Sequence, residues 1–225
     1  MQISGRGFFI LLLACASPAN ASGGAHVIDD ASVETPGRCH LESWFTRYTQ
    51  NSGLLDASLA CTRKALPSVE IGGTIQHSWN GKHYTTVGPA LKFNIRNVER
   101  GWGVALAMAG NWRFDHHHLE SGSVVVPVTV PIGDRLQLNF NAGYLYFGHG
   151  SDHNAAFAGV QAEVQLTRDL GAMGEVFSRD RGPVGGQAGL RWNPGRGDVD
   201  VDLLVGRYVD GASPRAITLG LTMRH

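Results

Sequence analysis

The chain has 225 residues, with 19 lysine and arginine residues against 19 aspartate and glutamate residues, 30 glycines and 43% hydrophobic residues. The balanced charge gives no basic surface for nucleic acid, and no apolar run is long enough for a membrane-spanning helix. The hydrophobic content is ample for a fold, so the composition disfavours global disorder and predicts a glycine-rich single domain built from strands.

The first 21 residues have the pattern of an export signal. Arg6 supplies a positive charge, residues 8–16 are apolar, and residues 19–21 form the small-x-small sequence after which signal peptidase cuts. A lipoprotein box ending at Cys15 is an alternative, but the apolar stretch before it is very short. We therefore expect residues 1–21 to be a removed signal peptide.

Two cysteines remain in the exported chain. Cys39 and Cys61 are an even pair in an oxidising compartment, so we expect a disulfide bond between them. Such a bridge contributes roughly 3 kcal/mol through the entropy of the closed loop. We expect residues 22–38 to form a flexible N-terminal segment and residues 39–225 to form one domain.

Alternation of apolar with polar or small residues dominates the chain from Val69 onward. Leu136, Leu138 and Phe140, for example, are separated by amide side chains, which is the period of a strand with one apolar face. Ten strands are expected on this basis, at residues 69–79, 83–96, 102–114, 123–131, 135–147, 155–166, 171–179, 184–193, 198–207 and 216–225.

Two more segments, residues 42–49 and 57–64, have weaker alternation. If both are strands, the sheet has twelve, and both chain ends lie on the same side. If neither is, the sheet has ten, and the segment from Cys39 to Cys61 becomes a plug or cap. Both counts are even, so both permit an antiparallel sheet to close on itself.

The links between these strands alternate in length. Short links are expected at residues 97–101, 132–134, 167–170 and 193–197, and longer polar links at residues 115–121, 148–154, 180–183 and 208–215. Strands of roughly 9 to 13 residues, with short turns on one side and longer loops on the other, are typical of a meander that crosses a bilayer.

Aromatic residues fall near the ends of the predicted strands. Trp102 and Trp192 lie at the short-turn ends, and the long-loop ends carry Trp79, Trp112, Tyr144, Tyr146 and Tyr208. Two such belts are typical of side chains placed at the two interfaces of a membrane.

With these features, residues 40–225 resemble the small bacterial outer-membrane β-barrels. The resemblance implies an all-β fold, an up-and-down antiparallel transmembrane-type β-barrel of 10 to 12 strands. It also implies location in the bacterial outer membrane, with membrane lipid and the outer-membrane assembly machinery as partners. Barrels of this class end on an aromatic residue, whereas the alternation here continues through Met223 and the chain ends at His225. The implied function is a passive small-solute channel or a structural or surface protein, without a cofactor.

If the apolar set of side chains faces lipid, the polar set lines the lumen. The charged residues expected there are Lys92, Arg113, Glu163, Glu175, Arg191, Asp200 and Asp202. Both signs of charge are present, so ion pairs inside the barrel are expected. The sequence leaves open whether a barrel of this size is filled or conducts.

A second interpretation is an outer-membrane lipid hydrolase. His149 and Ser151, followed by Glu163, are similar to the His-x-Ser and later Glu of the lipid A deacylases, which the resemblance would make the base, the nucleophile and the orienting group. Asp152 stands where that family has asparagine. The alternation also turns Glu163 toward the lumen, whereas a lipid substrate requires the lipid side. We therefore favour a protein that is not an enzyme.

Two further alternatives remain. His116, His118, His149 and His153 lie near the predicted long loops and, with nearby carboxylates, are candidate ligands for a transition metal, although neighbouring strand side chains point to opposite faces. A soluble periplasmic β-barrel that binds an apolar ligand would have the same alternation with the apolar side chains turned inward.

Overall fold

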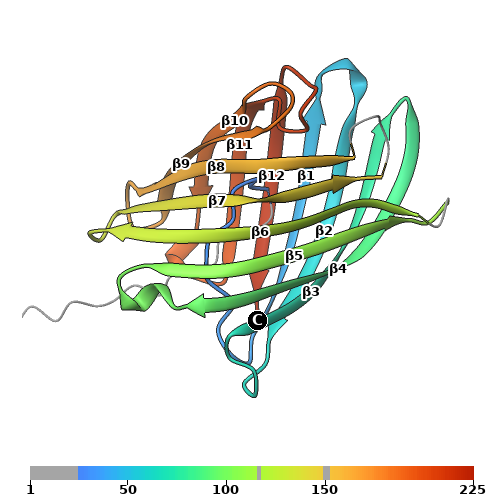
Figure 1. Ribbon diagram of the computed structural model, residues 1–225. Coiled ribbons are helices and arrows are strands. Elements are labelled where there is room, and N and C mark those ends of the chain that lie inside the picture. The colour runs from blue at the N-terminus through green and yellow to red at the C-terminus, as the bar shows by residue number, and fades with distance from the viewer. Residues whose placement is uncertain (1–24, 116–117, 149–152) are drawn as a thin grey trace, which may run out of the picture.

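Twelve antiparallel strands form a closed barrel in the computed structural model, which describes residues 25–115, 118–148 and 153–225 (Figure 1). Each strand pairs with its neighbours along the chain, and β1 closes the barrel against β12. The strands are β1 (Cys39–Tyr48), β2 (Gly53–Thr62), β3 (Val69–Asn80), β4 (Lys82–Arg96), β5 (Gly103–Arg113), β6 (Leu119–Ile132), β7 (Leu136–Phe147), β8 (Asn154–Gln165), β9 (Leu170–Arg179), β10 (Gly185–Trp192), β11 (Val199–Arg207) and β12 (Ala216–Arg224).

The part of the chain that the structure describes has three short 3-10 helices in the links between strands: η1 (Thr49–Asn51), η2 (Val98–Arg100) and η3 (Pro194–Arg196). Over the described ranges, no helix has the length and apolar character that a membrane span requires.

The two weakly patterned segments are strands, so the count of twelve is correct and the ten-strand alternative is wrong. Cys39 on β1 lies directly opposite Cys61 on β2, and the two form the expected disulfide bond. The segment between these cysteines is therefore a hairpin in the barrel wall, and not a plug or cap.

The two ends of the barrel differ in what they hold. One end, called here the terminal end, holds Cys39, His225 and the links at residues 63–68, 97–102, 133–135, 166–169 and 193–198. The opposite end, called here the loop end, holds the links at residues 49–52, 81, 114–118, 148–153, 180–184 and 208–215.

The expected sorting of links by length is not present. The single-residue link at Gly81 and the link at residues 208–215, which is the longest, both lie at the loop end. Gly81 has a φ of 70°, which glycine adopts without steric cost and which permits this tight turn. Two strands extend clearly further toward the loop end than the alternation predicts. β2 and β6 begin four residues earlier than expected, because the added residues, such as Leu54 beside Leu55 on β2, pair with the neighbouring strand without a regular apolar alternation.

The barrel is apolar outside and largely polar inside. Leu203 and Leu219, which pair across β11 and β12, are 54% and 53% exposed on the outer wall. Asp200 and Asp202 on β11 alternate with these outward residues and are each 1% exposed. A barrel with its apolar face inward, as the soluble periplasmic alternative requires, is therefore excluded.

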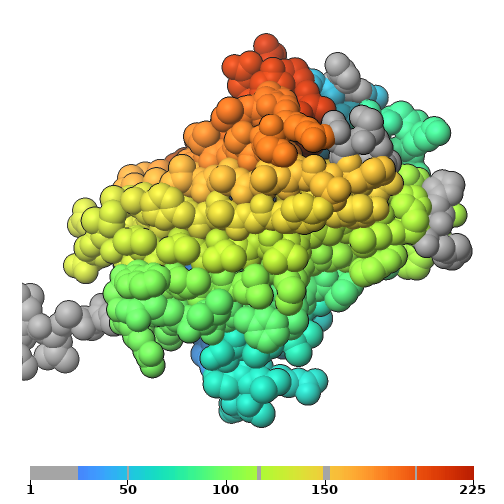
Figure 2. Space-filling model, in the orientation of Figure 1, coloured from blue at the N-terminus to red at the C-terminus, as the bar shows by residue number. Residues whose placement is uncertain are grey.

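The outer wall carries aromatic side chains near both ends. Trp102 and Trp192 are about half exposed at the terminal end, while Trp112 and Tyr144 are similarly exposed toward the loop end. The guanidinium of Arg96 lies 4.6 Å from the centre of the Trp102 ring, a cation–π contact that fixes this ring at the edge of the wall. Figure 2 shows strands β5–β9 lying side by side as a continuous outer surface.

Substitution of Leu203 by arginine tests which medium the outer wall contacts. A charge at the middle of a lipid-facing strand costs about 2–4 kcal/mol, so we expect Leu203→Arg to lower the amount of folded barrel in outer-membrane extracts. The measurement is the gel mobility of unboiled against boiled protein. Leu203→Ala is the control, and equal amounts of folded barrel for both variants would contradict a lipid-facing wall.

Candidate functional site

The candidate site is the lumen together with an N-terminal segment that lies inside it. Residues 25–34, called here the lumen segment, run through the barrel interior in an irregular conformation (Figure 1). Ile28, Asp30 and Ala31 are completely buried there. The sequence pattern predicts only a flexible segment at residues 22–38, and these contacts are the main functional feature that it misses.

One part of the lumen segment is held by β9 and β10. The carboxylate of Glu175 accepts hydrogen bonds from the backbone N–H groups of Val27 and Ile28, at 2.9 and 3.2 Å. The amide of Gln187 donates to the carbonyl of Ala25 at 2.9 Å and to Glu175 at 2.8 Å. Glu175 is thus satisfied by backbone and amide donors, as a buried carboxylate requires.

Strands β4, β6 and β7 hold the next part of the segment. The Asn141 side chain accepts from the N–H of Asp29 at 2.9 Å and donates to the carbonyl of the same residue at 2.7 Å. Thr129 accepts from the N–H of Ala31 at 2.9 Å, and Asn94 donates to the carbonyl of Ala31 at 2.6 Å. Two residues of the segment therefore have both main-chain groups paired by side chains of the wall.

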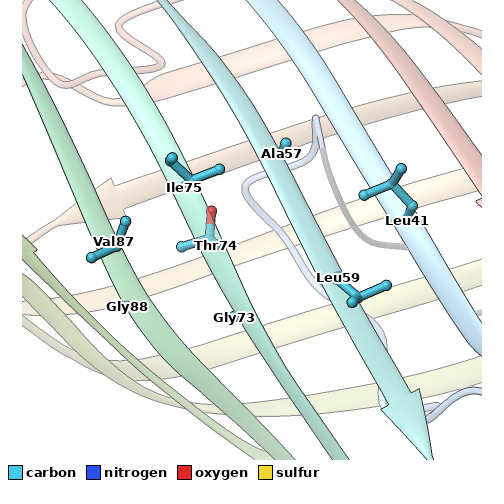
Figure 3. A pocket seen from close by; sticks show the side chains of 8 residues that line it. All are labelled: Leu41, Ala57, Leu59, Gly73, Thr74, Ile75, Val87 and Gly88. Atoms are coloured by element: carbon cyan, nitrogen blue, oxygen red, sulfur yellow. The ribbon is translucent and has the colours of Figure 1, made fainter.

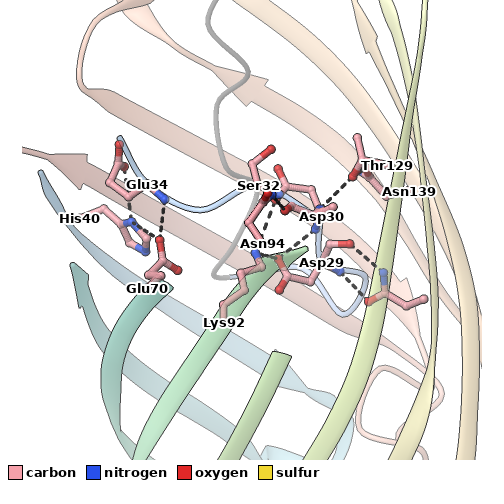
Figure 4. Close-up of polar contacts among 12 residues, drawn as sticks. Asp29, Asp30, Ser32, Glu34, His40, Glu70, Lys92, Asn94, Thr129 and Asn139 are labelled. Carbon is pink, nitrogen blue, oxygen red and sulfur yellow. Dashed lines mark hydrogen bonds and ion pairs between the residues drawn. The ribbon is translucent and has the colours of Figure 1, made fainter. Parts of the chain in front are cut away.

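Lys92 supplies the charge that matches the acidic pair of the segment (Figure 4). Its ammonium lies 2.9 Å from Asp29 Oδ1 and 3.5 Å from Asp30 Oδ1. Lys92 is 8% exposed and Asp30 is fully buried, so these charges interact with little screening by water and salt.

A second charged group lies near the terminal end. Glu34 is 3.4 Å from His40, and its N–H donates to Glu70 at 2.7 Å (Figure 4). Glu34 also lies 3.5 Å from Arg224. Burial would raise the pKa of Glu34, but the contact with His40 and the charge of Arg224 hold that pKa below its ordinary value. The ionised form of Glu34 therefore stabilises this end of the segment.

Apolar contact anchors the middle of the lumen segment. Ile28 packs with Phe157 and Phe177, and Val125 and Leu145 lie around this cluster. Gly159 leaves the space for Ile28, because a β-carbon at Gly159 would meet the Ile28 side chain. Two more inward glycines have the same role elsewhere: a β-carbon at Gly103 would lie 3.2 Å from the Ala31 β-carbon, and one at Gly220 would lie 3.1 Å from that of Ala25.

The wall opposite Lys92 contains its own ion pairs. The Arg191 guanidinium donates two hydrogen bonds to the Asp202 carboxylate in a bidentate pair, at 2.8 and 2.9 Å, and lies 3.9 Å from Glu163. Arg224 donates to Asp200 at 2.7 Å. His26 of the lumen segment lies 3.4 Å from Asp202 and 4.0 Å from Glu175, which connects the segment to this network.

Arg113 lies apart from the other lumen residues, near the loop end. It donates to both carboxylate oxygens of Asp115, at 2.9 and 2.6 Å, and its guanidinium lies 4.3 Å from the Tyr84 ring centre. Glu120, which is 3.9 Å away, extends this group. The structure thus brings six of the seven predicted lumen residues around or opposite the lumen segment, and places Arg113 at the loop-end mouth.

Of the three residues of the hydrolase interpretation, the structure describes Glu163, while His149 and Ser151 lie outside the described residues. Glu163 lies on β8 toward the terminal end, nine residues from Asn154, which is about 30 Å of extended strand. Its carboxylate accepts a hydrogen bond from Asn139 inside the barrel, so Glu163 faces the lumen as the alternation predicts.

Of the four candidate metal ligands, His116 and His149 lie outside the described residues. His118 is 3.2 Å from Glu120, and His153 contacts the carbonyl of Phe147 at 2.7 Å and stacks on Tyr146. Among the residues that the structure describes, no group of three or more potential ligands is close enough to hold a metal ion.

Two depressions lie on the outer wall. The first, of about 540 Å³, is lined by β1–β4 side chains such as Leu41, Leu59 and Ile75 (Figure 3). The second, of about 510 Å³, lies beside Trp112 and Tyr144. Both have apolar linings and are continuous with the exposed apolar surface, so they belong to the wall and contribute no polar chemistry.

Comparison with known proteins places the chain in a family. It belongs to the family described as "Uncharacterised conserved protein UCP029691", whose model matches residues 10–225. No curated protein matches the chain in sequence.

Solved structures share its fold. The KdgM porin in complex with disordered oligogalacturonate is similar with a TM-score of 0.64 at 5% identity, over 82% of this chain and 98% of that chain. The NanC porin has a TM-score of 0.57 at 9% identity over 82% and 98% of the two chains. The COG4313 outer membrane channel from Pseudomonas putida F1 has a TM-score of 0.59 at 7% identity over 87% and 98%. The chain therefore has the fold of the outer-membrane β-barrel porins.

Removal of the Lys92 charge should loosen the lumen segment. Breaking a buried ion pair costs about 3 kcal/mol, or about 100-fold in the equilibrium for segment release. A Ser32→Cys reporter, buried in the segment, should react with a maleimide faster in Lys92→Met than in the parent. Lys82→Met removes an exposed lysine and is the matched control. Equal labelling rates in all three proteins would show that Lys92 does not hold the segment.

Proposed function

We propose that this protein is an outer-membrane channel for small solutes, in which the lumen segment controls passage. The observation that carries the proposal is the combination of an apolar outer wall with a polar, charged lumen of twelve strands, crossed by a segment that is not part of the wall. A barrel of this size lies between one filled by side chains and one with an open pore. With the segment inside, the barrel is filled, and with the segment released, the barrel has an open pore.

The shared porin fold supports the outer membrane as the location. The apolar residues exposed on β11 and β12, together with aromatic residues near both ends, are what contact with a bilayer requires. The identity of the solute does not follow from the fold. KdgM was solved with oligogalacturonate, but at 5% identity its lumen side chains do not transfer to this chain.

The lumen segment contacts the wall through reversible interactions. The segment is held by hydrogen bonds, by the ion pairs of Lys92 and Glu34, and by the packing of Ala25 and Ile28. Release leaves the wall intact, because the strand pairing that closes the barrel does not involve residues 25–34. The segment therefore acts as an internal gate.

A disulfide tether tests the gate directly. The Ala31 β-carbon lies 3.2 Å from the ideal β-carbon position at Gly103, so a bridge between Ala31→Cys and Gly103→Cys forms after a shift of a few tenths of an ångström. In the Lys92→Met background, we expect low conductance in planar bilayers while the bridge is oxidised and a several-fold increase after reduction.

The Lys92→Met protein without the added cysteines controls for reduction of the native Cys39–Cys61 bond. Equal conductance of the oxidised and reduced tethered protein would show that the segment is not a gate. If no form conducts, although the gel shift shows folded barrels, the channel proposal is wrong.

A further inference from the structure

The lumen recognises the main chain of the segment inside it. Among the described residues, eight hydrogen bonds join wall side chains to backbone groups of the lumen segment, five to N–H groups and three to carbonyls. The wall residues come from six strands: Glu70, Asn94, Thr129, Asn141, Glu175 and Gln187. Bonds of this kind are independent of the side chains of the bound peptide, as in other sites that bind peptides through their backbone.

Two of these wall residues each bind two main-chain groups. Asn141 pairs with both the N–H and the carbonyl of Asp29, as a neighbouring strand would. Glu175 accepts from two successive N–H groups. A wall side chain that bonds to two main-chain groups fixes which residue of the segment lies opposite it.

Side-chain selection is confined to a few positions of the segment. Ile28 enters the pocket formed by Phe157 and Phe177, and the next two residues are carboxylates that face Lys92. Glu34 meets His40 and Arg224 further along. The wall therefore matches a short peptide with an apolar residue followed by acidic residues.

We propose that the lumen is a binding site for short acidic peptides, which occupy it in place of the lumen segment. The inference rests on the proposed channel function and names the class of solute that the channel admits. The lumen segment is then the resident ligand of the site, attached to the barrel through residues 35–38.

Disulfide trapping in the full-length protein tests this site. The protein carries Gly103→Cys, and the probe is a synthetic peptide of residues 25–37 with Ala31→Cys, activated as a mixed disulfide with a pyridine thiol. Exchange transfers the peptide sulfur to the protein thiol and releases the pyridine thione. The product is then visible as a mass shift on a non-reducing gel. Because the trap is irreversible, it also detects peptide that enters only when the resident segment leaves.

Two matched peptides serve as controls. One has the same composition and the same cysteine position in scrambled order, and the other carries Ile28→Gly. We expect the natural sequence to form adduct about tenfold faster than either control, since each removes part of the register or the apolar anchor. A gel shift without boiling confirms that the Gly103→Cys barrel is folded.

Equal rates for the natural and scrambled peptides would overturn the proposal, because charge alone would then explain entry. If none of the three peptides forms an adduct, the proposal is overturned as well, whether or not a small thiol reagent labels position 103. Conductance is read separately. If the natural peptide forms adduct selectively but the tethered proteins do not conduct, the peptide site is supported and the channel is rejected. If the proteins conduct but no peptide forms adduct selectively, the channel is supported and the peptide site is rejected.

Discussion

The structure depends on one constraint: charged groups turned into a closed barrel must find partners there. The wall supplies some of them, as in the contacts of Arg191 with Asp202 and of Arg224 with Asp200. It leaves Lys92 to the lumen segment, and Glu175 accepts hydrogen bonds both from the segment and from the wall amides of Gln161 and Gln187. The segment is therefore part of the electrostatic balance of the interior, and its removal leaves charges that water or a solute must satisfy.

The apolar outer face and the polar inner face of the barrel have different roles. The outer face fixes the register of the strands, because a shift by one residue would turn every leucine of β12 inward. The inner face is then free to carry recognition, and it does so with amides, a hydroxyl and carboxylates distributed over many strands. Inward glycines at positions 103, 159 and 220 make room for the segment to approach the wall.

Much of this fold can be predicted from the sequence, because one face of each strand meets an apolar medium. Alternation is weaker in β1 and β2, where Ser43 and Arg47 point outward and Leu54 points inward, so the choice between ten and twelve strands stays open. The predicted lumen residues follow from the same alternation. The lumen segment cannot be predicted in this way, since an irregular segment has no period and its partners are distant in sequence.

The turn at Gly37 determines how the segment is connected to the wall. Gly37 has a φ of 96° and its N–H bonds to the carbonyl of Thr62, a conformation that other residues adopt only at a cost. The chain is thus anchored beside the first strand even when its remaining length leaves the interior. A released segment stays at an effective concentration in the millimolar range. Any free molecule that uses the same contacts must therefore compete with the tethered segment, so a weakly binding molecule occupies the lumen only at high concentration.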